Sequence, residues 1–181
     1  ATLNTRTLAM LDHAQRVYDT YYPANIANFR QAITQGSYNA GGVTASFGTH
    51  DGGGAVDLSV RDPLDFSVLT DEIEPMIEAL RIAGFAAWLR DTGSLYADSP
   101  IHLHTIAVGD AEHAAAARLQ IDGERGYLVG FNGLPADYGA PQPIPDGHGG
   151  PVICAWMRDD GWTDQRADAP ADYYERALDR L

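Results

Sequence analysis

The sequence contains no lysine, and its twelve basic residues are all arginine. Any side chain that neutralises a carboxylate of a ligand is therefore a guanidinium, which binds a carboxylate through two parallel N–H groups. Basic residues are also outnumbered, because 25 Asp and Glu residues give a formal net charge of −13. Without a basic patch, we expect no binding to nucleic acid, whose phosphates attract Lys and Arg, and little affinity for acidic membrane surfaces.

Cysteine is almost absent, since Cys154 is the single one. One cysteine cannot form a disulfide within the chain, which excludes a disulfide framework and leaves the redox compartment open. Cys154 stands in the apolar run of residues 151–157. This run predicts a buried structural thiol rather than a nucleophile.

Long apolar runs are absent as well. No stretch approaches the roughly eighteen consecutive apolar residues that a membrane helix needs. The chain opens without the charged start and apolar run of a signal peptide. We therefore expect a soluble chain with no membrane span.

The chain does have the length for one domain with a hydrophobic core. It has 181 residues, of which 45% are hydrophobic and 20% charged, as is ordinary for a globular protein. We expect a single domain over residues 1–181, with a Gly/Pro-rich loop at about 123–150 and a short C-terminal helix at 172–181. A loop of that length is uncommon unless it has a role such as covering a cleft. The alternative is a loop that packs on the protein surface without such a role.

Hydrophobic periodicity predicts where the helices and strands lie. Apolar residues that recur at intervals of three and four indicate amphipathic helices, and runs or alternations of apolar residues indicate strands. Helices that are separate from a mostly antiparallel sheet indicate an α+β fold. The predicted elements are helices over residues 4–22, 25–34, 70–83 and 110–121, and strands over residues 43–47, 57–60, 85–90 and 100–108.

Two stretches carry residues suited to metal chemistry. In the first, residues 49–57, three glycines form a turn that directs His50 back toward Asp57 at the start of a predicted strand. In the second, residues 100–108, polar and apolar residues alternate with period two, so His102 and His104 share one face of a strand. Two histidines and a carboxylate suit zinc, and three ligands leave a fourth position open for water, as in catalytic sites.

Each stretch alone has a simpler interpretation. Three consecutive glycines are usually only a turn, and a lone His-x-His is more often a half-exposed strand face than a pair of ligands. The combination of both, on strands short enough to be neighbours, favours a metal site. The remaining histidines are weaker candidates. We expect His13 to be a surface or core residue and His113 to be a solvated residue on a helix face, and only His148, in the long loop, could approach the metal.

The first stretch also fits the pattern His-x-x-Gly-x-Ala-x-Asp, which His50, Gly53, Ala55 and Asp57 fill, with His-x-His following. This pattern resembles the superfamily of lysostaphin, the D-Ala-D-Ala metallopeptidases and the hedgehog amino-terminal domain. The likeness spans roughly residues 43–109, a little over a third of the chain.

The resemblance implies a fold, a metal and an activity. The fold would be a small, mostly antiparallel sheet with helices packed on it. A zinc ion would be held by His50, Asp57 and His104, with His102 beside it as a catalytic residue. The activity would be that of a zinc peptidase acting on peptides of the cell-wall type, which implies an extracytoplasmic location.

Two departures from the D-Ala-D-Ala peptidase pattern concern the mechanism. Gly48 stands where a serine is usual, and Ile101 stands where a glutamate is usual. Without that glutamate the general base has to be another group, and His102 is placed for it, since imidazole is the side chain most often used for proton transfer. Asp51 and Asp98 are weaker candidates for the base.

The substrate depends on whether the chain binds a terminal carboxylate. Arg30, Arg61 and Arg90 are the arginines nearest to the motifs in the sequence and are the candidate carboxylate binders. The longer motif favours a D-Ala-D-Ala carboxypeptidase, while the missing glutamate points to a peptidoglycan endopeptidase or amidase. A zinc-containing binding protein without turnover is a further alternative. A cupin-like oxygenase is disfavoured because no glutamate follows His104 at the required spacing.

Overall fold

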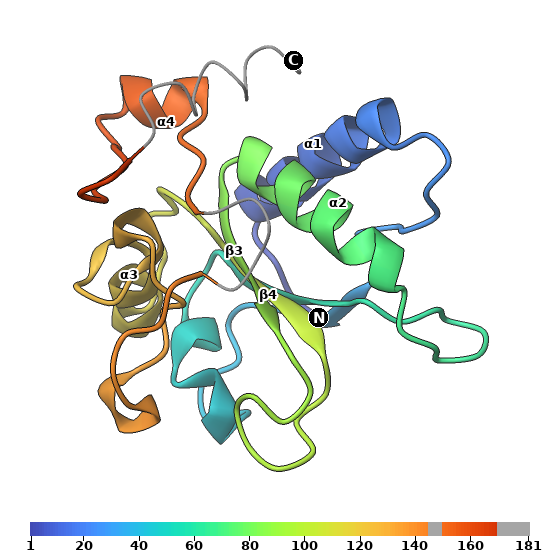
Figure 1. Cartoon of the computed structure of the whole chain (residues 1–181), viewed down its shortest axis with the longest axis horizontal. Helices are drawn as coiled ribbons and strands as arrows, with labels where there is room; N and C mark the ends of the chain where they lie inside the picture. The colour runs from blue at the N-terminus through green and yellow to red at the C-terminus, as the bar shows by residue number, and fades with distance from the viewer. Residues whose placement is uncertain (145–149, 170–181) are drawn as a thin grey trace.

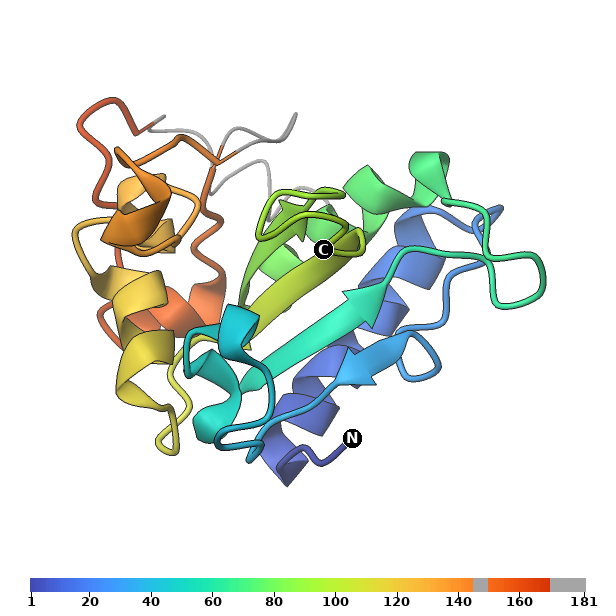
Figure 2. The same cartoon turned by 90° about the horizontal axis from the view of Figure 1, so that it is seen from below.

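The computed structural model describes residues 1–144 and 150–169. Its centre is a four-stranded antiparallel sheet in the order β1-β2-β4-β3. Figures 1 and 2 show helices on both sides of this sheet. The predicted α+β class is confirmed. The strands are β1 (Ile33–Gln35), β2 (Ala55–Ser59), β3 (Phe85–Arg90) and β4 (His102–Ala107), and the helices in the described part of the chain are α1 (Thr5–Tyr21), α2 (Thr70–Ile82), α3 (Ala115–Asp122) and α4 (Ala155–Asp159).

One face of the sheet is covered by α1 and α2 (Figure 1). Side chains alternate between the two faces of a strand, so every second residue of β2, β3 and β4 points to this side. Val56, Leu58 and Leu103 on this face are fully buried against the two helices. This layer is the larger part of the hydrophobic core.

The opposite face is only partly covered. At one end the row Ala55, Ile106 and Ala86 is buried beneath α3 and α4. The next two rows on the same face are Asp57, His104 and Trp88, and then Ser59, His102 and Arg90. Along β2 this face therefore changes from apolar at Ala55 to polar at Ser59, and the polar rows contain the predicted site residues.

Several predicted elements agree with the structure. The first helix begins after Asn4, whose Oδ1 accepts a hydrogen bond from the backbone N–H of Thr7, as an N-cap does. The helix predicted over residues 70–83 and the strand over 85–90 match α2 and β3. Cys154 is buried, as predicted. No helix in the described ranges combines the length and apolar character of a membrane span.

The helix predicted over residues 25–34 is wrong. The segment makes turns and then enters the sheet as the edge strand β1, where Ile33 pairs with Leu58. The backbone N–H of Phe29 donates to the side chain of Gln15 on α1, and Ile26 is 66% exposed. Docking to α1 and pairing with β2 thus override a helical spacing that is present in the sequence.

The strand predicted over residues 43–47 is also wrong. Residues Thr44–Ser46 form a 3-10 turn, η1, and no sheet partner lies beside them. Positive φ angles at Gly41, Phe47 and Gly48 bend the backbone on both sides of this turn. An extended strand cannot continue through such positions.

Two further predictions need correction or lie outside the description. The helix predicted from residue 110 begins only at Ala115, and His113 precedes it as a buried residue whose Nε2–H donates to the carbonyl of Ala107. The expectation of a solvated His113 is therefore wrong. The predicted C-terminal helix at 172–181 and His148 lie outside the described residues.

Candidate metal centre

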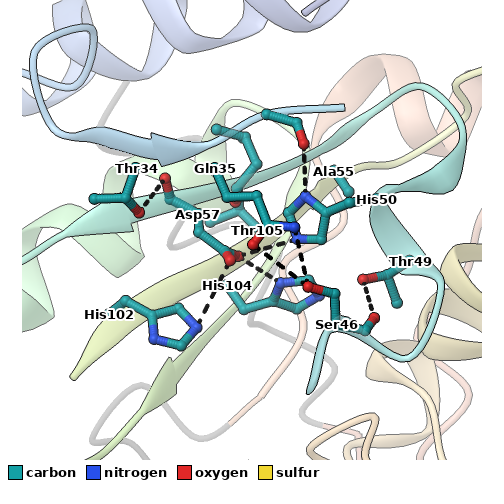
Figure 3. A network of polar contacts seen from close by, with 12 residues as sticks. Thr34, Gln35, Ser46, Thr49, His50, Ala55, Asp57, His102, His104 and Thr105 are labelled. Carbon is teal, nitrogen blue, oxygen red and sulfur yellow. Dashed lines mark hydrogen bonds and ion pairs between the residues drawn. The ribbon is translucent and has the colours of Figure 1, made fainter. Parts of the chain in front are cut away.

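Three elements bring His50, Asp57 and His104 together. Asp57 on β2 and His104 on β4 are direct cross-strand partners on the same face of the sheet. His50 comes from a 3-10 turn, η2 (Thr49–Asp51), which lies above that face. Figure 3 shows the two imidazole rings and the carboxylate pointing toward one another. The three side chains are buried and lie close enough to bind a metal ion, with one ligand atom of each within 4.8 Å of the others.

The glycines between His50 and Asp57 allow the chain to pass under the loop before α3. A Cβ atom on Gly52 would lie 2.3 Å from the carbonyl oxygen of Glu112, which is closer than atoms can approach. Gly54 has a φ of +86°, and a Cβ there would lie 2.7 Å from the ring of His113. The glycine-rich turn is therefore required for His50 to reach Asp57.

The ring of His50 presents a free acceptor to the site. Its Nδ1 lies 2.9 Å from the carbonyl oxygen of Gly36, which can only accept, so Nδ1 carries the proton and donates. In the neutral ring, Nε2 is then an acceptor. It is buried, lies 3.3 Å from Oδ1 of Asp57 and has no hydrogen-bond partner among the described residues.

The ring of His104 lies between two acceptors. Its Nδ1 lies 2.8 Å from Oδ1 of Asp57 and its Nε2 lies 3.1 Å from Oε1 of Gln120 on α3, and both oxygens can only accept. The single N–H of the neutral ring donates to one of them; when Nε2 carries it, Nδ1 turns a lone pair toward Asp57. A proton or a metal cation between the three side chains satisfies every polar atom of this buried group, which fits a metal site with two imidazole ligands and one carboxylate.

Burial and mutual contacts also shift the pKa values of these groups. Burial lowers the pKa of His104 to about 4, against the opposing effect of Asp57. Burial acts to raise the pKa of Asp57, but hydrogen bonds and charge from His104 and His50 outweigh it and hold this pKa well below its usual range. Burial acts to lower the pKa of His50, but the close contact with the charged carboxylate of Asp57 raises it overall. The arrangement keeps Asp57 ionised and His104 neutral near neutral pH.

His102 lies beside this group without belonging to it. It shares the strand face with His104, and its Nδ1–H donates to the carbonyl of Pro100 over 2.8 Å. Its Nε2 is therefore an acceptor in the neutral ring and lies 3.9 Å from Oδ2 of Asp57 (Figure 3). The ring lines the adjacent pocket, where a ligand can reach Nε2.

The metal-site residues form part of the wall of a pocket of about 370 Å³. This volume lies at the lower end of the range for small-molecule sites, about 300–1,000 Å³. The loop between β3 and β4 and the segment that contains η1 and η2 supply much of the remaining wall. Asp51 and Asp98, the weaker candidates for the base, are not among the residues that line it.

The three candidate carboxylate binders have different surroundings. Arg90 lines the pocket and is only 4% exposed, and its Nη2 is buried without a hydrogen-bond partner among the described residues. Arg61 lines the pocket too, but its Nη1–H donates to the carbonyl of Phe66. Arg30 lies outside the pocket wall and forms a surface ion pair with Asp12.

Arg90 is held in place by its neighbours. Its guanidinium lies 5.3 Å from the ring centre of Trp88, a cation–π distance. Burial lowers the pKa of Arg90 to about 10, against the opposing charge of Asp57. Arg90 therefore remains charged at neutral pH, and one of its N–H groups lacks an acceptor.

Gln120 and Trp88 are site residues that the sequence analysis missed. Oε1 of Gln120 lies 3.1 Å from Nε2 of His104, and the indole of Trp88 stacks on the same imidazole at 17° and 5.8 Å. Gln120 belongs to an alanine-rich helix and carries no local signal. Trp88 could have been found, because it stands two residues before Arg90 on a correctly predicted strand and so shares its face.

Comparison with known proteins adds no relatives to this picture. The chain matches no protein-family model, no curated protein and no solved structure. The functional assignment therefore depends on the residues of the site themselves.

Proposed function

We propose that the protein is a zinc-dependent peptidase that resembles the lysostaphin, D-Ala-D-Ala metallopeptidase and hedgehog superfamily, with D-Ala-D-Ala carboxypeptidase-like activity on cell-wall peptides. The observation that carries the proposal is the convergence of three possible ligand atoms, from His50, Asp57 and His104, at the wall of an open pocket. The α+β fold, with the motif on adjacent antiparallel strands, is consistent with it.

The donor set favours zinc. Two imidazole nitrogens and one carboxylate oxygen suit zinc better than Mg²⁺ or Ca²⁺, which prefer oxygen ligands. With a metal bound, each imidazole would donate its other ring N–H, His50 to Gly36 and His104 to Gln120, which is the usual second contact of a metal-bound histidine. A zinc ion held there supplies Lewis acidity, which activates water and polarises a carbonyl group.

His102 supplies the proton transfer in this proposal. Its Nε2 is free to accept a proton from the attacking water and to pass it to the departing amine. It takes the place of the glutamate that Ile101 replaces in the motif. Its position at the pocket wall, next to Asp57, favours turnover over a purely structural metal site.

Arg90 is the group that we assign to the terminal carboxylate of the substrate. A buried guanidinium with an unsatisfied N–H is costly unless a ligand completes its hydrogen bonds. Arg61 and Arg30 already donate to Phe66 and Asp12. A free carboxylate bound by Arg90 distinguishes a carboxypeptidase from an endopeptidase or amidase, which needs no such contact.

The test uses two forms of one peptide. A cell-wall stem peptide that ends in D-Ala-D-Ala is offered to the zinc-loaded protein beside the same peptide amidated at its C-terminus. We expect D-alanine to be released from the free acid alone. Equal cleavage of both forms, or internal cleavage, would support the endopeptidase or amidase alternative, and zinc binding without any cleavage would support the binding protein.

The same assay tests the role of Arg90. Arg90→Lys keeps the charge but loses the planar pair of N–H groups, so we expect it to bind zinc normally and to lose most of the preference for the free acid. Arg30→Ala is the matched control and should behave as the native protein. A preference for the free acid that survives in Arg90→Lys would remove Arg90 from the proposal.

A further inference from the structure

Two kinds of side chain line the pocket. The sheet face contributes polar groups, which include His102, His104 and Arg90. The residues on either side of η1 and the loop between β3 and β4 contribute large apolar side chains. These are Val43, Phe47, Leu95 and Tyr96, which we call the apolar wall.

The apolar wall is not part of the hydrophobic core. Val43 is 46% exposed and Tyr96 is 51% exposed, and neither belongs to the buried clusters on the two faces of the sheet. Large apolar side chains that remain exposed beside a ligand pocket gain stability when an apolar group of a ligand covers them. Their position is therefore better explained by a ligand than by folding.

The apolar wall is also fixed in position. The hydroxyl of Tyr138 donates to the carbonyl of Leu95 over 2.7 Å, and its ring packs edge-on against Phe47 at 5.1 Å. Tyr138, from the turn η4 (Ala136–Tyr138), thus joins the two segments that carry the wall. A preformed wall binds a ligand without the entropic cost of ordering loops.

The polar groups of the sheet face and the apolar wall line one small cavity, so a single ligand contacts both. A volume of about 370 Å³ accommodates a ligand of a few residues but not a separate molecule on each. We infer that the substrate carries a large apolar side chain, which packs against Val43 and Tyr96, in addition to the carboxylate that Arg90 binds. This inference rests on the proposed function and narrows its substrate class to peptides with an apolar residue near the free C-terminus.

Charge favours the same substrate class. The formal net charge of −13 repels polyanionic ligands, and charged residues are absent from the apolar wall. An uncharged, apolar residue next to one carboxylate minimises this repulsion.

The test measures binding rather than turnover. N-acetyl-X-D-Ala-D-Ala peptides, in which X is phenylalanine, leucine, glutamine or alanine, are titrated into the zinc-free protein by calorimetry, so that no cleavage takes place. All share one carboxylate and differ only in the side chain. We expect the phenylalanine and leucine probes to bind about 10- to 100-fold more tightly than the glutamine and alanine probes, as in other apolar subsites.

Variants locate the effect. Tyr96→Ser and Val43→Ser should each weaken binding of the phenylalanine and leucine probes about tenfold, with zinc content and binding of the alanine probe unchanged. Leu64→Ser is the matched control, because Leu64 is 89% exposed and lies outside the pocket wall, so it should change nothing. Equal binding of all probes, or unchanged discrimination in Tyr96→Ser, would overturn the inference.

The two proposals fail in different ways. Failure of the proposed function appears as absence of zinc uptake or of peptide cleavage, and the probe comparison can still be read. Failure of the inference appears as loss of discrimination between probes in a protein that still binds zinc and releases D-alanine.

Discussion

At the scale of single residues, the site depends on which ring nitrogen of each histidine carries the proton. The carbonyl of Gly36 keeps the proton of His50 on Nδ1 and leaves its Nε2 toward Asp57, while Gln120 offers an acceptor to Nε2 of His104 when Nδ1 binds a cation beside Asp57. Removing any one of the three ligands leaves only two. We therefore expect His50→Ala, Asp57→Ala and His104→Ala each to lower zinc content sharply, measured by elemental analysis. Near-stoichiometric zinc in any of them would contradict the ligand assignment.

His102 should behave differently from the three ligands. His102→Ala is expected to keep its zinc while losing about two to four orders of magnitude in kcat, the usual contribution of a general base. Zinc content and peptide hydrolysis are measured on the same preparation. Loss of zinc together with activity would mean that His102 is a metal ligand and that one of His50, Asp57 and His104 is not.

Gln120 provides a test that does not touch a ligand. Gln120→Ala removes the acceptor of His104 Nε2–H, so the ring can turn and its Nδ1 is no longer aimed at Asp57. We expect the zinc dissociation constant to rise about 10- to 100-fold, the usual effect of losing such a contact. Gln120→Glu, which restores an acceptor, should recover tight binding.

The control for Gln120 lies on the same helix. Leu119 is 65% exposed, so Leu119→Ala tests whether a change in α3 alone alters zinc affinity. An unchanged dissociation constant in Gln120→Ala, or an equal rise in Leu119→Ala, would show that the contact to His104 does not matter.

The ligand candidates could be named from the sequence because they stand at short, regular spacings. His50 and Asp57 belong to one turn-and-strand segment, and His102 and His104 alternate on one strand. Gln120 could not be found in this way, because its contact with His104 joins elements that only the tertiary fold brings together. The choice among the arginines depended on burial and hydrogen bonding, which the sequence does not encode locally.

At the scale of elements, the glycine-rich turn decides whether His50 reaches the sheet. Gly54→Ala would place a Cβ at a φ of +86° and 2.7 Å from the ring of His113. Gly41→Ala is a matched control, with a φ of +71° but no atom within 4 Å. We expect Gly41→Ala to cost about 1 kcal/mol from backbone strain alone, and Gly54→Ala to cost about 1–3 kcal/mol more from overpacking.

The comparison is made by urea unfolding of the zinc-free proteins. Without zinc, the free energy of unfolding reports the turn itself rather than metal binding. Equal losses in the two variants would mean that the contact with His113 does not constrain the turn.

Elements with a long and regular pattern were predicted well, and short ones were not. α1, α2 and β3 bury one continuous stripe or face, so periodicity alone was sufficient. Residues 25–34 carry a helical spacing, yet pairing of Ile33 with Leu58 draws their end into the sheet. Residues 43–47 look like a strand, but Phe47 has a φ of +53°, which their composition does not reveal.

At the scale of the whole molecule, one sheet serves both the core and the site. The face beneath α1 and α2 is apolar along its length, whereas the other face is apolar only where α3 and α4 cover it. The uncovered rows contain Asp57, His104, His102 and Arg90. The pocket thus forms where the helical layer ends, and the rigid sheet below it holds the site residues in register.

Zinc should stabilise this fold in a pH-dependent way. Only the unprotonated form of His50 can bind a metal, and contact with Asp57 raises the pKa of His50 above its ordinary 6.5. Protons therefore compete with zinc as the pH falls through that raised value. Burial lowers the pKa of His104 to about 4, so its proton competes only in stronger acid.

The metal-free protein has its own dependence on pH. The lowered pKa of His104 means that the unfolded chain binds a proton between about pH 6.5 and 4 that the folded chain does not bind, so stability falls with acid in that window. The raised pKa of His50 has the opposite sign, since its contribution is present below pH 6.5 and is lost as the pH rises through the folded value. The zinc-dependent change must therefore be measured as a difference between loaded and metal-free protein at each pH.

We expect that difference to be largest near pH 7.5 and to fall toward zero near pH 5. At a zinc concentration about a hundredfold above the dissociation constant, binding adds about 2.7 kcal/mol, which corresponds to a rise in Tm of about 5–10 °C for a chain of this size. Calorimetry of both forms across this pH range measures it, with His50→Ala as the control that should show no rise at any pH. A rise that is independent of pH, or that persists in His50→Ala, would mean that zinc binds elsewhere. At the proposed site, the protonation of His50 competes with zinc, so the rise must depend on both pH and His50.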